Sequence, residues 1–356
     1  MHIVIRAGGA GTRLWPVSRR GAPKQFQSIL GTVSMIEKAV SRIQALNVDK
    51  QSVWISVNKN LLARLRDEIE IPDDHIIIEQ ETRNTGPGIC LEVCFLEKKV
   101  PLDTVIASLP SDDYISNEQA FIDLLLASER FIIEHPEYIV APAVKPDYPE
   151  VGYSYLKAGK RLDEGAQEAM FAVADLVEKP NKEYCEELIE SGVHYWHTGM
   201  YVWQLKRIIE LFEQYQPAMI EICRKIVASG SEEDLALFSS LEKISIESAI
   251  THRTSTIAMS VSNHLGWSDV GKWPAVKRLS AEDEYANVAL GSARFHKSSD
   301  NLVYNRNTQK LVILNGVKNI AVIDTGGVLL VSDLESTEDI KTILDQLSEE
   351  DLEHYL

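Results

Sequence analysis

The chain has 356 residues, of which 45% are hydrophobic and 25% charged, so it can form about two domains and fill a core in each. Lysine and arginine number 36 against 53 aspartate and glutamate residues, which gives a formal net charge of −17 at pH 7. The composition excludes a disordered chain, and the negative field disfavours general binding to nucleic acid or to anionic membranes. We expect neither as a partner, so a local arrangement of cations and backbone amides must capture any anionic ligand.

The four cysteines, Cys90, Cys94, Cys185 and Cys223, show neither the paired spacing of a zinc site nor the density of a disulfide framework. We therefore expect a reducing, cytoplasmic environment. The first residues lead directly into a glycine-rich turn without the apolar core of a signal peptide. Because no apolar run reaches about 18 residues, the sequence predicts no membrane-spanning helix.

Apolar runs of strand length alternate with longer segments of helical period in the first part of the chain. The expected strands span 3–5, 53–57, 76–78, 105–109 and 138–141, and the expected helices 34–46, 61–69, 88–96 and 118–135. Ser34 and Glu37 form a capping box at the start of the first helix. This alternation predicts a doubly wound α/β domain that binds its ligand at the carboxyl ends of the strands.

The pattern becomes mixed from about residue 142, with strands expected near 172–177 and 200–203 and helices near 205–215 and 217–228. This half extends the first domain, which we place at 1–283. In 284–356, short strands at 302–304, 311–314, 320–323 and 328–331 are separated by Asn-Gly and Gly-Gly turns and followed by a helix near 337–347. These strands form a small β module that either docks on the first domain or builds a homodimer interface; composition does not choose.

A glycine-rich loop follows the first expected strand directly and reads Ala-Gly-Gly-Ala-Gly-Thr-Arg-Leu-Trp-Pro over residues 7–16. Glycines at Gly8, Gly9 and Gly11 allow several backbone N–H groups to converge on an anion. Arg13 within the loop and Lys24 beyond it add two cations, which favours a polyphosphate ligand over a tight turn of purely structural role. The loop lacks the last glycine of the dinucleotide fingerprint and the Gly-Lys-Ser/Thr of nucleotide hydrolases.

This loop, with Pro-Lys-Gln-Phe at 23–26, resembles the mannose-1-phosphate guanylyltransferase family of sugar-1-phosphate nucleotidyltransferases. Six further motifs follow in that family's order: Glu-Thr-Arg-Asn-Thr at 81–85, Pro-Ser-Asp at 110–112, Pro-Glu-Val-Gly-Tyr at 149–153, Val-Glu-Lys-Pro at 177–180, Trp-His-Thr-Gly-Met at 196–200 and Gly-Trp-Ser-Asp-Val-Gly at 266–271. The resemblance implies a Rossmann-like α/β fold with a doubly wound mixed, mainly parallel sheet and a small C-terminal β-helix-like module.

The resemblance also implies a reaction: transfer of a guanylyl group from GTP to mannose 1-phosphate, giving GDP-mannose and pyrophosphate. The attacking phosphate monoester is already anionic near neutral pH, so no general base is required. The protein must hold two anions in line and neutralise charge as pyrophosphate leaves, which calls for cations and Mg²⁺ as cofactor.

The catalytic residues implied by the resemblance are Arg13, Lys24, Asp112 and Asp269. Arg13 can fork onto the β- and γ-phosphates, and Lys24, a compact charge, would lie nearer the α-phosphate. Asp112 and Asp269 would hold Mg²⁺, which usually takes one or two carboxylates plus substrate phosphates. The alternatives are a helix cap for Asp112 and a turn residue for Asp269.

The nucleotide and sugar contacts carried over from the family fall on the same motifs. The nucleotide-binding residues are Ala7, Gly8, Gly9, Gly11, Thr12, Arg13, Lys24, Arg83, Asn84, Thr85 and Asp112, and the sugar-binding residues are Gly152, Tyr153, Glu178, Lys179, His197, Thr198 and Gly199. Two structural alternatives stay open: an Asx-turn at Asn84 and a solvated pair of Glu178 with Lys179.

Several residues depart from the family pattern. Arg6 replaces an aliphatic residue and Asp113 a histidine; because strands one and four are neighbours in the order 3-2-1-4, we hypothesise that Arg6 pairs with Asp112 or Asp113. Val151 and His197 replace a threonine and an asparagine of the sugar pocket, which leaves a relative such as a manno-heptose 1-phosphate as an alternative substrate. The sequence also leaves open an enzyme for a different sugar or base and a catalytically silent nucleotide-sugar sensor.

Overall fold

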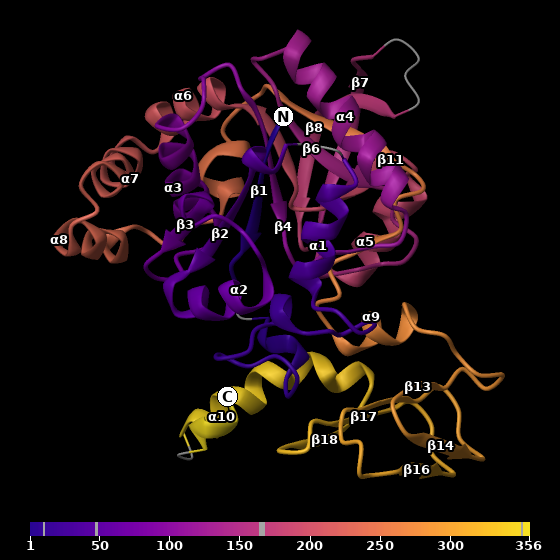
Figure 1. Cartoon of the computed structure of the whole chain (residues 1–356). Helices are drawn as coiled ribbons and strands as arrows, with labels where there is room; N and C mark the ends of the chain where they lie inside the picture. The colour runs from indigo at the N-terminus through magenta and orange to yellow at the C-terminus, as the bar shows by residue number, and fades with distance from the viewer. Residues whose placement is uncertain (10, 47–48, 164–167, 350–351) are drawn as a thin grey trace. The chain divides into compact units, whose positions relative to one another are not determined.

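The structure is a computed structural model that describes residues 1–9, 11–46, 49–163, 168–349 and 352–356. These residues form two compact units that interleave along the chain (Figure 1). Unit 1 comprises Met1–Gly8, Ala39–Ser111 and Ile115–Trp267, and unit 2 comprises Gly9–Lys38, Asp112–Tyr114 and Ser268–Leu356. The division into domains 1–283 and 284–356 stays a prediction.

Four parallel strands form one end of the ten-stranded sheet of unit 1. They are β1 (His2–Ala7), β2 (Val53–Asn58), β3 (Ile76–Glu79) and β4 (Val105–Pro110), in the order β3-β2-β1-β4. Their near-continuous apolar sequences suit strands that are covered on both faces. The predicted order is confirmed, and the pairing sets Arg6 opposite Pro110, so polar residues at the carboxyl ends of β1 and β4 are neighbours.

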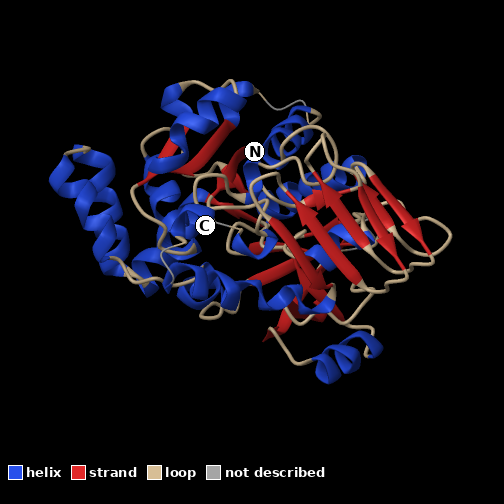
Figure 2. Cartoon of the chain, turned by 90° about the horizontal axis from the view of Figure 1, so that it is seen from below, coloured by secondary structure: helices blue, strands red, loops and turns tan. Residues whose placement is uncertain are grey.

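The same sheet continues beyond β4 with strands of mixed direction. Figure 2 colours the strands of the chain red and the helices blue. In sheet order these are β10 (Tyr201–Gln204), β6 (Ile139–Val144), β9 (His194–His197), β7 (Ser154–Arg161), β8 (Ala169–Glu178) and β11 (Ile257–Ser262). Strands β10, β9, β7 and β8 pair antiparallel with their neighbours, and β11 runs parallel to β6. The expected α/β class, with a parallel core inside a mixed sheet, is confirmed.

Helices cover both faces of the sheet in unit 1 (Figure 1). Helices α3 (Thr85–Glu97), α6 (Leu205–Tyr215) and α7 (Pro217–Ser229) pack together over one face, in a core that includes Val4, Ile106 and Phe212. Helix α4 (Glu118–Glu134) packs on β6, β10 and β11. The remaining helices are α2 (Leu62–Glu68), α5 (Lys182–Glu190) and α8 (Glu232–Ala236).

Helix α1 (Met35–Gln44) begins at the predicted capping box. The backbone N–H of Ser34 donates to Glu37 Oε2 at 2.7 Å, and the backbone N–H of Glu37 donates to Ser34 Oγ at 3.3 Å. These reciprocal bonds satisfy two amides that a helix start leaves unpaired, so the capping box is confirmed.

The C-terminal strands of unit 2 form a β-helix-like coil. Strands β13 (Val288–Leu290), β15 (Leu302–Asn305) and β17 (Ile320–Asp324) pair in parallel, and β14 (Ala293–His296) pairs in parallel with β16 (Val312–Asn315) in a second sheet. Successive strands therefore alternate between two sheets, with Ala293, Val303 and Val322 packed together. Strand β18 (Leu329–Asp333) closes the first sheet antiparallel to β17 after a turn at Gly326. The expected β-helix-like module is confirmed.

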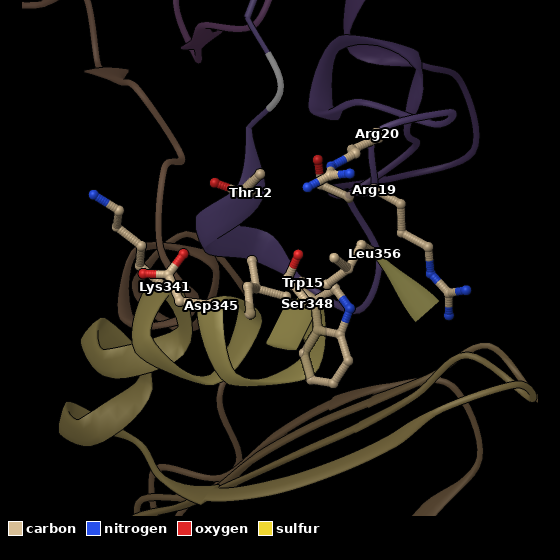
Figure 3. Close-up of a pocket in the computed structure, with 10 residues that line it drawn as sticks. Thr12, Trp15, Arg19, Arg20, Lys341, Asp345, Ser348 and Leu356 are labelled. Carbon is tan, nitrogen blue, oxygen red and sulfur yellow. The ribbon is translucent and has the colours of Figure 1, made fainter. Parts of the chain in front are cut away.

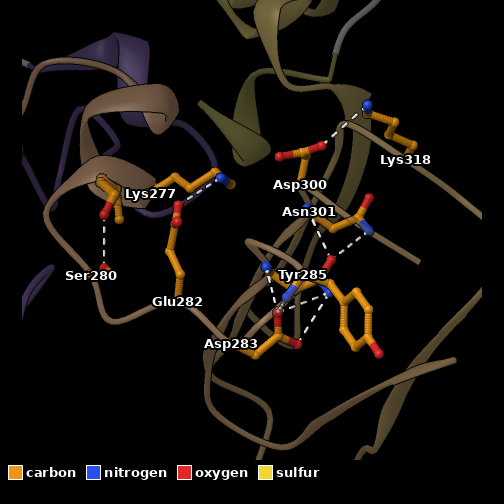
Figure 4. A network of polar contacts seen from close by, with 10 residues as sticks. Lys277, Ser280, Glu282, Asp283, Tyr285, Asp300, Asn301 and Lys318 are labelled. Carbon is orange, nitrogen blue, oxygen red and sulfur yellow. Dashed lines mark hydrogen bonds and ion pairs between the residues drawn. The ribbon is translucent and has the colours of Figure 1, made fainter. Parts of the chain in front are cut away.

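A polar network fixes the entry to this coil (Figure 4). The carboxylate of Asp283 accepts from the backbone amides of Tyr285 and Asn287, and Asn287 Oδ1 accepts from the side chain of Asn301 at 2.8 Å.

The remaining elements are short or lie beside the coil in sequence. Helix α9 (Trp273–Arg278) precedes the strands of the coil and helix α10 (Ile340–Glu349) follows them. Strands β5 (Tyr114–Ile115) and β12 (Trp267–Ser268) have two residues each. Within the described residues, no helix combines the length and the apolar character needed to cross a bilayer.

Candidate active site

The glycine loop between β1 and the first short turn lies against Lys24. Gly9 and Gly11 both have positive φ, at 92° and 58°, which favours glycine there, and Ala10 between them is outside the described residues. A Cβ on Gly11 would overlap the Cβ of Lys24. Gln25 Nε2 donates to the Gly9 carbonyl at 3.2 Å, so the loop is held against the Lys24 segment from both ends.

Arg13 lies in the 3-10 turn η1 (Thr12–Leu14), which begins at Gly11. Leu14 is fully buried in the core of unit 2, whereas the Arg13 side chain remains 52% exposed. Its Nη2 lies 4.0 Å from Asp269 Oδ2. The anchored Leu14 therefore holds the turn while the Arg13 guanidinium stays accessible to an anion.

Lys24 is the buried cation of the site. It begins the 3-10 turn η2 (Lys24–Phe26) and is only 3% exposed. Its Nζ donates to Asp112 Oδ2 at 2.9 Å and to the backbone carbonyl of Asp269. Burial alone would lower the pKa of Lys24, but the charges of Asp112, Asp269 and Asp113 outweigh it and hold the pKa above its ordinary value. Lys24 is therefore an ammonium ion.

Asp112 and Asp269 are brought together by this lysine although 157 positions separate them in the sequence. Their side chains are 31% and 29% exposed, so both carboxylates are accessible. Asp269 Oδ1 also accepts from the backbone N–H of Gly271, which fixes its orientation. We call Arg13, Lys24, Asp112 and Asp269 the Lys24 cluster; all four belong to unit 2.

The donor set of the cluster fits a magnesium ion. Hard cations of this size prefer carboxylate oxygens and commonly bind one or two of them together with substrate phosphates. Within the described residues, no three His, Cys, Asp or Glu side chains gather to hold a metal by themselves. An ion at this site would therefore need phosphate oxygens as further ligands. The two carboxylates are partly exposed, so a phosphate group can approach an ion bound to them.

The expected base-contacting loop lies at the start of α3. Asn84 has φ 68° and its Oδ1 accepts from the backbone N–H of Thr85 at 2.8 Å, which caps the helix. Thr85 Oγ1 accepts from the amide of Ile246 at 2.9 Å, and Arg83 forms an ion pair with Glu81 at 2.9 Å. Each of these side chains thus has a structural partner, and their contact with the base stays a prediction.

The expected sugar-binding residues of unit 1 fall into separate groups. Tyr153 is buried and packs against the rings of Trp196 and Trp267, with centroids 5.3 and 5.1 Å away. His197 follows Trp196 in β9, and successive residues of a strand point to opposite faces. The His197 ring packs 5.1 Å from Tyr201, so Tyr153 and His197 do not lie on the same side of β9.

The remaining expected sugar contacts lie at turns. The backbone N–H of Gly152 donates to Glu150 Oε1 at 2.8 Å. Glu178 ends β8 and is exposed, as is Lys179, whose φ of 44° is unusual for a residue with a side chain. Between β9 and β10, Thr198 Oγ1 donates to the Pro142 carbonyl at 2.7 Å and Gly199 has φ 72°. Their roles toward a sugar stay predictions.

Comparison with known proteins decides the family. The family model described as nucleotidyl transferase matches residues 2–285. The chain is 30% identical over 352 residues to an Escherichia coli protein named mannose-1-phosphate guanylyltransferase, covering 97% of this chain and 75% of the relative. It is 31% identical over 359 residues to a Klebsiella pneumoniae protein of the same name, covering 99% and 75%. The chain belongs to the mannose-1-phosphate guanylyltransferase family.

A solved structure supports the fold of this family member. The chain is similar to a Thermus thermophilus protein named mannose-1-phosphate geranyltransferase, with a TM-score of 0.86 and 24% identity over 98% of this chain and 99% of the other. As a member of the nucleotidyl transferase family the chain is an enzyme, and the family implies a nucleoside triphosphate and a sugar phosphate as substrates.

Two cavities of this family member contain residues that the motifs did not single out. One, of about 190 Å³ in unit 2, is lined by Thr12, Trp15 and Arg20 of the loop region and by Lys341 and Ser348 of α10 (Figure 3). Trp15 Nε1 donates to the Tyr355 carbonyl at 2.8 Å, so the C-terminal residues support the segment that carries Arg13.

The second cavity, of about 450 Å³ in unit 1, is lined by Trp196 and Trp267 together with Lys145, Asp147 and Asn263. It adjoins the expected sugar motifs because Tyr153 packs against both tryptophans. Lys145 and Asp147 lie just before the Pro-Glu-Val-Gly-Tyr motif, which was the only sequence signal that could have pointed to them.

Arg6 has other partners than the sequence suggested. Its hydrogen bonds within the described residues go to Ser108 Oγ and to the Gly199 carbonyl, while Asp112 accepts from Lys24. The hypothesis of an Arg6 pair with Asp112 or Asp113 stays a prediction, and the structure adds Ser108 and Gly199 as hydrogen-bond partners of Arg6. Ser108 and Glu92 lie in none of the motifs recognised in the sequence, so sequence analysis did not single them out.

Proposed function

We propose that the chain transfers the guanylyl group of GTP to mannose 1-phosphate, or to a close relative of it, and releases pyrophosphate. The product would be GDP-mannose. The observation that carries the proposal is the Lys24 cluster, in which a buried ammonium binds the Asp112 carboxylate and the Asp269 backbone carbonyl, with the Asp269 carboxylate facing an accessible guanidinium. The names of the relatives at about 30% identity supply the base and the sugar.

The side chains of the cluster would act by position and charge. Arg13, half exposed at the end of the glycine loop, can donate two parallel hydrogen bonds to the β- and γ-phosphates and stay with the departing pyrophosphate. Lys24 is fixed by Asp112 and Asp269, so its charge is already in place near the α-phosphate before the reaction begins. The attacking phosphate needs no base because it is already an anion.

Asp112 and Asp269 would hold Mg²⁺. Mg²⁺ held by these two carboxylates would supply positive charge to offset the negative charge that develops on the phosphate groups. The proposal is supported by the exposure of the two carboxylates, 31% for Asp112 and 29% for Asp269, which leaves both accessible to an ion.

The sugar phosphate would be bound by residues of unit 1. Glu178 and Lys179, exposed at the end of β8, offer an acceptor for hydroxyls and a cation for phosphate. Thr198 and Gly199 present a turn whose backbone is fixed by hydrogen bonds. Burial lowers the pKa of His197, so this ring would be neutral where the family has an amide. We place the enzyme in the cytoplasm, which suits its four buried free thiols.

The experiment is a turnover panel. Pyrophosphate release is measured with mannose, glucose, fucose and manno-heptose 1-phosphates, each against GTP, ATP, UTP and dTTP, in the presence of Mg²⁺. We expect the highest kcat/KM with GTP and mannose 1-phosphate and formation of GDP-mannose. Preference for another base, or binding of GTP without turnover of any sugar phosphate, would contradict the proposal.

A further inference from the structure

The side chain of Arg6 connects three distant parts of unit 1. Arg6 lies near the carboxyl end of β1, where its Nη1 donates to Ser108 Oγ of β4 and its Nη2 to the Gly199 carbonyl, both at 2.6 Å. Gly199 follows β9 and is 193 positions away in the sequence. One guanidinium thus ties the central strands to the turn that carries His197 and Thr198.

A buried carboxyl group, that of Glu92, is linked to Arg6 through Ser108. Ser108 Oγ donates to Glu92 Oε2 at 3.1 Å, and Glu92, in α3, is only 2% exposed. Its other oxygen, Oε1, is buried and has no hydrogen-bond partner within the described residues. Burying a charged group is costly unless an opposite charge lies near, and Arg6 is the cation that acts on both Glu92 and Glu79.

The turn at 197–199 is held by hydrogen bonds to groups outside it. Gly199 adopts a positive φ of 72°, and within the turn Thr198 Oγ1 binds the Pro142 carbonyl on one side and accepts from the amide of Met200. The Gly199 carbonyl is bound by Arg6. Because a charged donor makes a stronger hydrogen bond than a neutral one, Arg6 restricts the turn more than a neutral side chain would.

We infer that Arg6 is a positioning residue that fixes turn 197–199 for the sugar 1-phosphate. The inference rests on the proposed function, in which this turn contacts the sugar. Arg6 touches neither substrate in this account; it acts by restricting the backbone of the turn. Its loss should therefore weaken sugar phosphate binding and leave GTP binding unchanged.

The test compares variants that distinguish the effect of losing the Arg6 and Glu92 charges from the effect of losing the hydrogen bond to the turn. Arg6→Met combined with Glu92→Leu removes both charges, so no unpaired carboxylate is left buried, and it also removes the bond to Gly199. Glu92→Gln is the control, because glutamine keeps an oxygen for Ser108 and leaves both Arg6 bonds in place. Arg6→Lys keeps the charge but can replace only one of the two bonds.

We expect the double variant to raise the KM for mannose 1-phosphate about tenfold, the effect of losing one charge-assisted hydrogen bond. The KM for GTP in the double variant should stay within about twofold of the parent, and so should both KM values of Glu92→Gln. For Arg6→Lys, the KM for mannose 1-phosphate should lie between those of the parent and the double variant. Amide hydrogen exchange at 198–200 should be faster in the double variant only.

Two results would overturn the inference. One is an unchanged KM for mannose 1-phosphate, or unchanged exchange at 198–200, in the double variant. The other is a parallel rise in both KM values together with a fall in kcat and in melting temperature, which would show a purely structural role. If the unmodified chain fails to release pyrophosphate, the proposed function is wrong, whereas the exchange experiment still decides whether Arg6 fixes the turn.

Discussion

Lys24 is the residue whose position determines the candidate site. It is buried, it contacts Asp112 and Asp269, and a side chain at Gly11 would displace it. We expect Lys24→Met to lower kcat/KM about a hundredfold or more, because a preorganised charge is lost and two carboxylates then face the triphosphate uncompensated. Pyrophosphate release at saturating and limiting GTP measures the effect.

Lys310→Met is the matched control for this prediction. Lys310 also forms an ion pair with an aspartate, Asp324, at 3.1 Å, but it belongs to the C-terminal strands and is half exposed. Its loss should change kcat/KM by less than about twofold, since Lys310 is not part of the Lys24 cluster. Equal losses in the two variants would show that Lys24 matters for folding alone.

Single residues of the site differ in how far the sequence could predict them. Arg13 and Lys24 were recognisable because they lie in short, ordered motifs that place them beside glycines. The bonds from Arg6 to Gly199 and through Ser108 to Glu92 were not, because they depend on strand register and on a turn far away in the chain. The helix-capping role of Asn84 was not predicted, because the sequence offered only contact with the base or an Asx-turn at this residue.

Helix α1 allows a direct test of the capping box that was predicted from the sequence. Replacing Ser34 with alanine removes the acceptor for the Glu37 amide at the start of the helix. We expect Ser34→Ala to reduce the free energy of unfolding by about 1 kcal/mol, measured by denaturant titration. Ser41→Ala, at an exposed position inside the same helix, should be neutral or slightly stabilising. Identical effects of the two changes would contradict a capping role.

Several elements with one or both faces buried were predictable, although the fully buried strand β11 was not among those expected. Strands β1 to β4 are short apolar runs, and α6 begins and ends at the predicted residues, because its apolar side follows the helical period. Strand β7 was missed because its second half is polar and exposed. The Asn-Gly turn at 315–316 marked a strand end correctly, but local sequence could not show that the chain then enters another sheet.

At the scale of the whole molecule, Glu92 should make stability depend on pH. Burial raises the pKa of the Glu92 carboxyl to about 7, and Arg6 only partly opposes this. The folded chain therefore keeps a proton that the unfolded chain releases near its ordinary pKa of 4.5. Stability from this group is fully present below that value and is lost as pH rises through about 7, a change of about 3 kcal/mol.

Denaturant titrations between pH 4.5 and 8 measure this dependence, and Glu92→Gln should flatten it, because an amide does not titrate. Glu210→Gln, on the exposed side of α6, is the control and should leave the slope unchanged. A parental slope in Glu92→Gln would show that other groups carry the pH dependence.

The central claim is that Arg13, Lys24, Asp112 and Asp269 form one site for a triphosphate and its divalent ion. The most direct measurement is a titration of the chain with Mn²⁺ in the presence of GTP, followed by electron paramagnetic resonance of the free ion. We expect one Mn²⁺ per chain that depends on GTP, with affinity at least tenfold lower in Asp112→Asn and in Asp269→Asn and unchanged in Asp67→Asn, an exposed control. Parental Mn²⁺ affinity in both cluster variants would contradict the account.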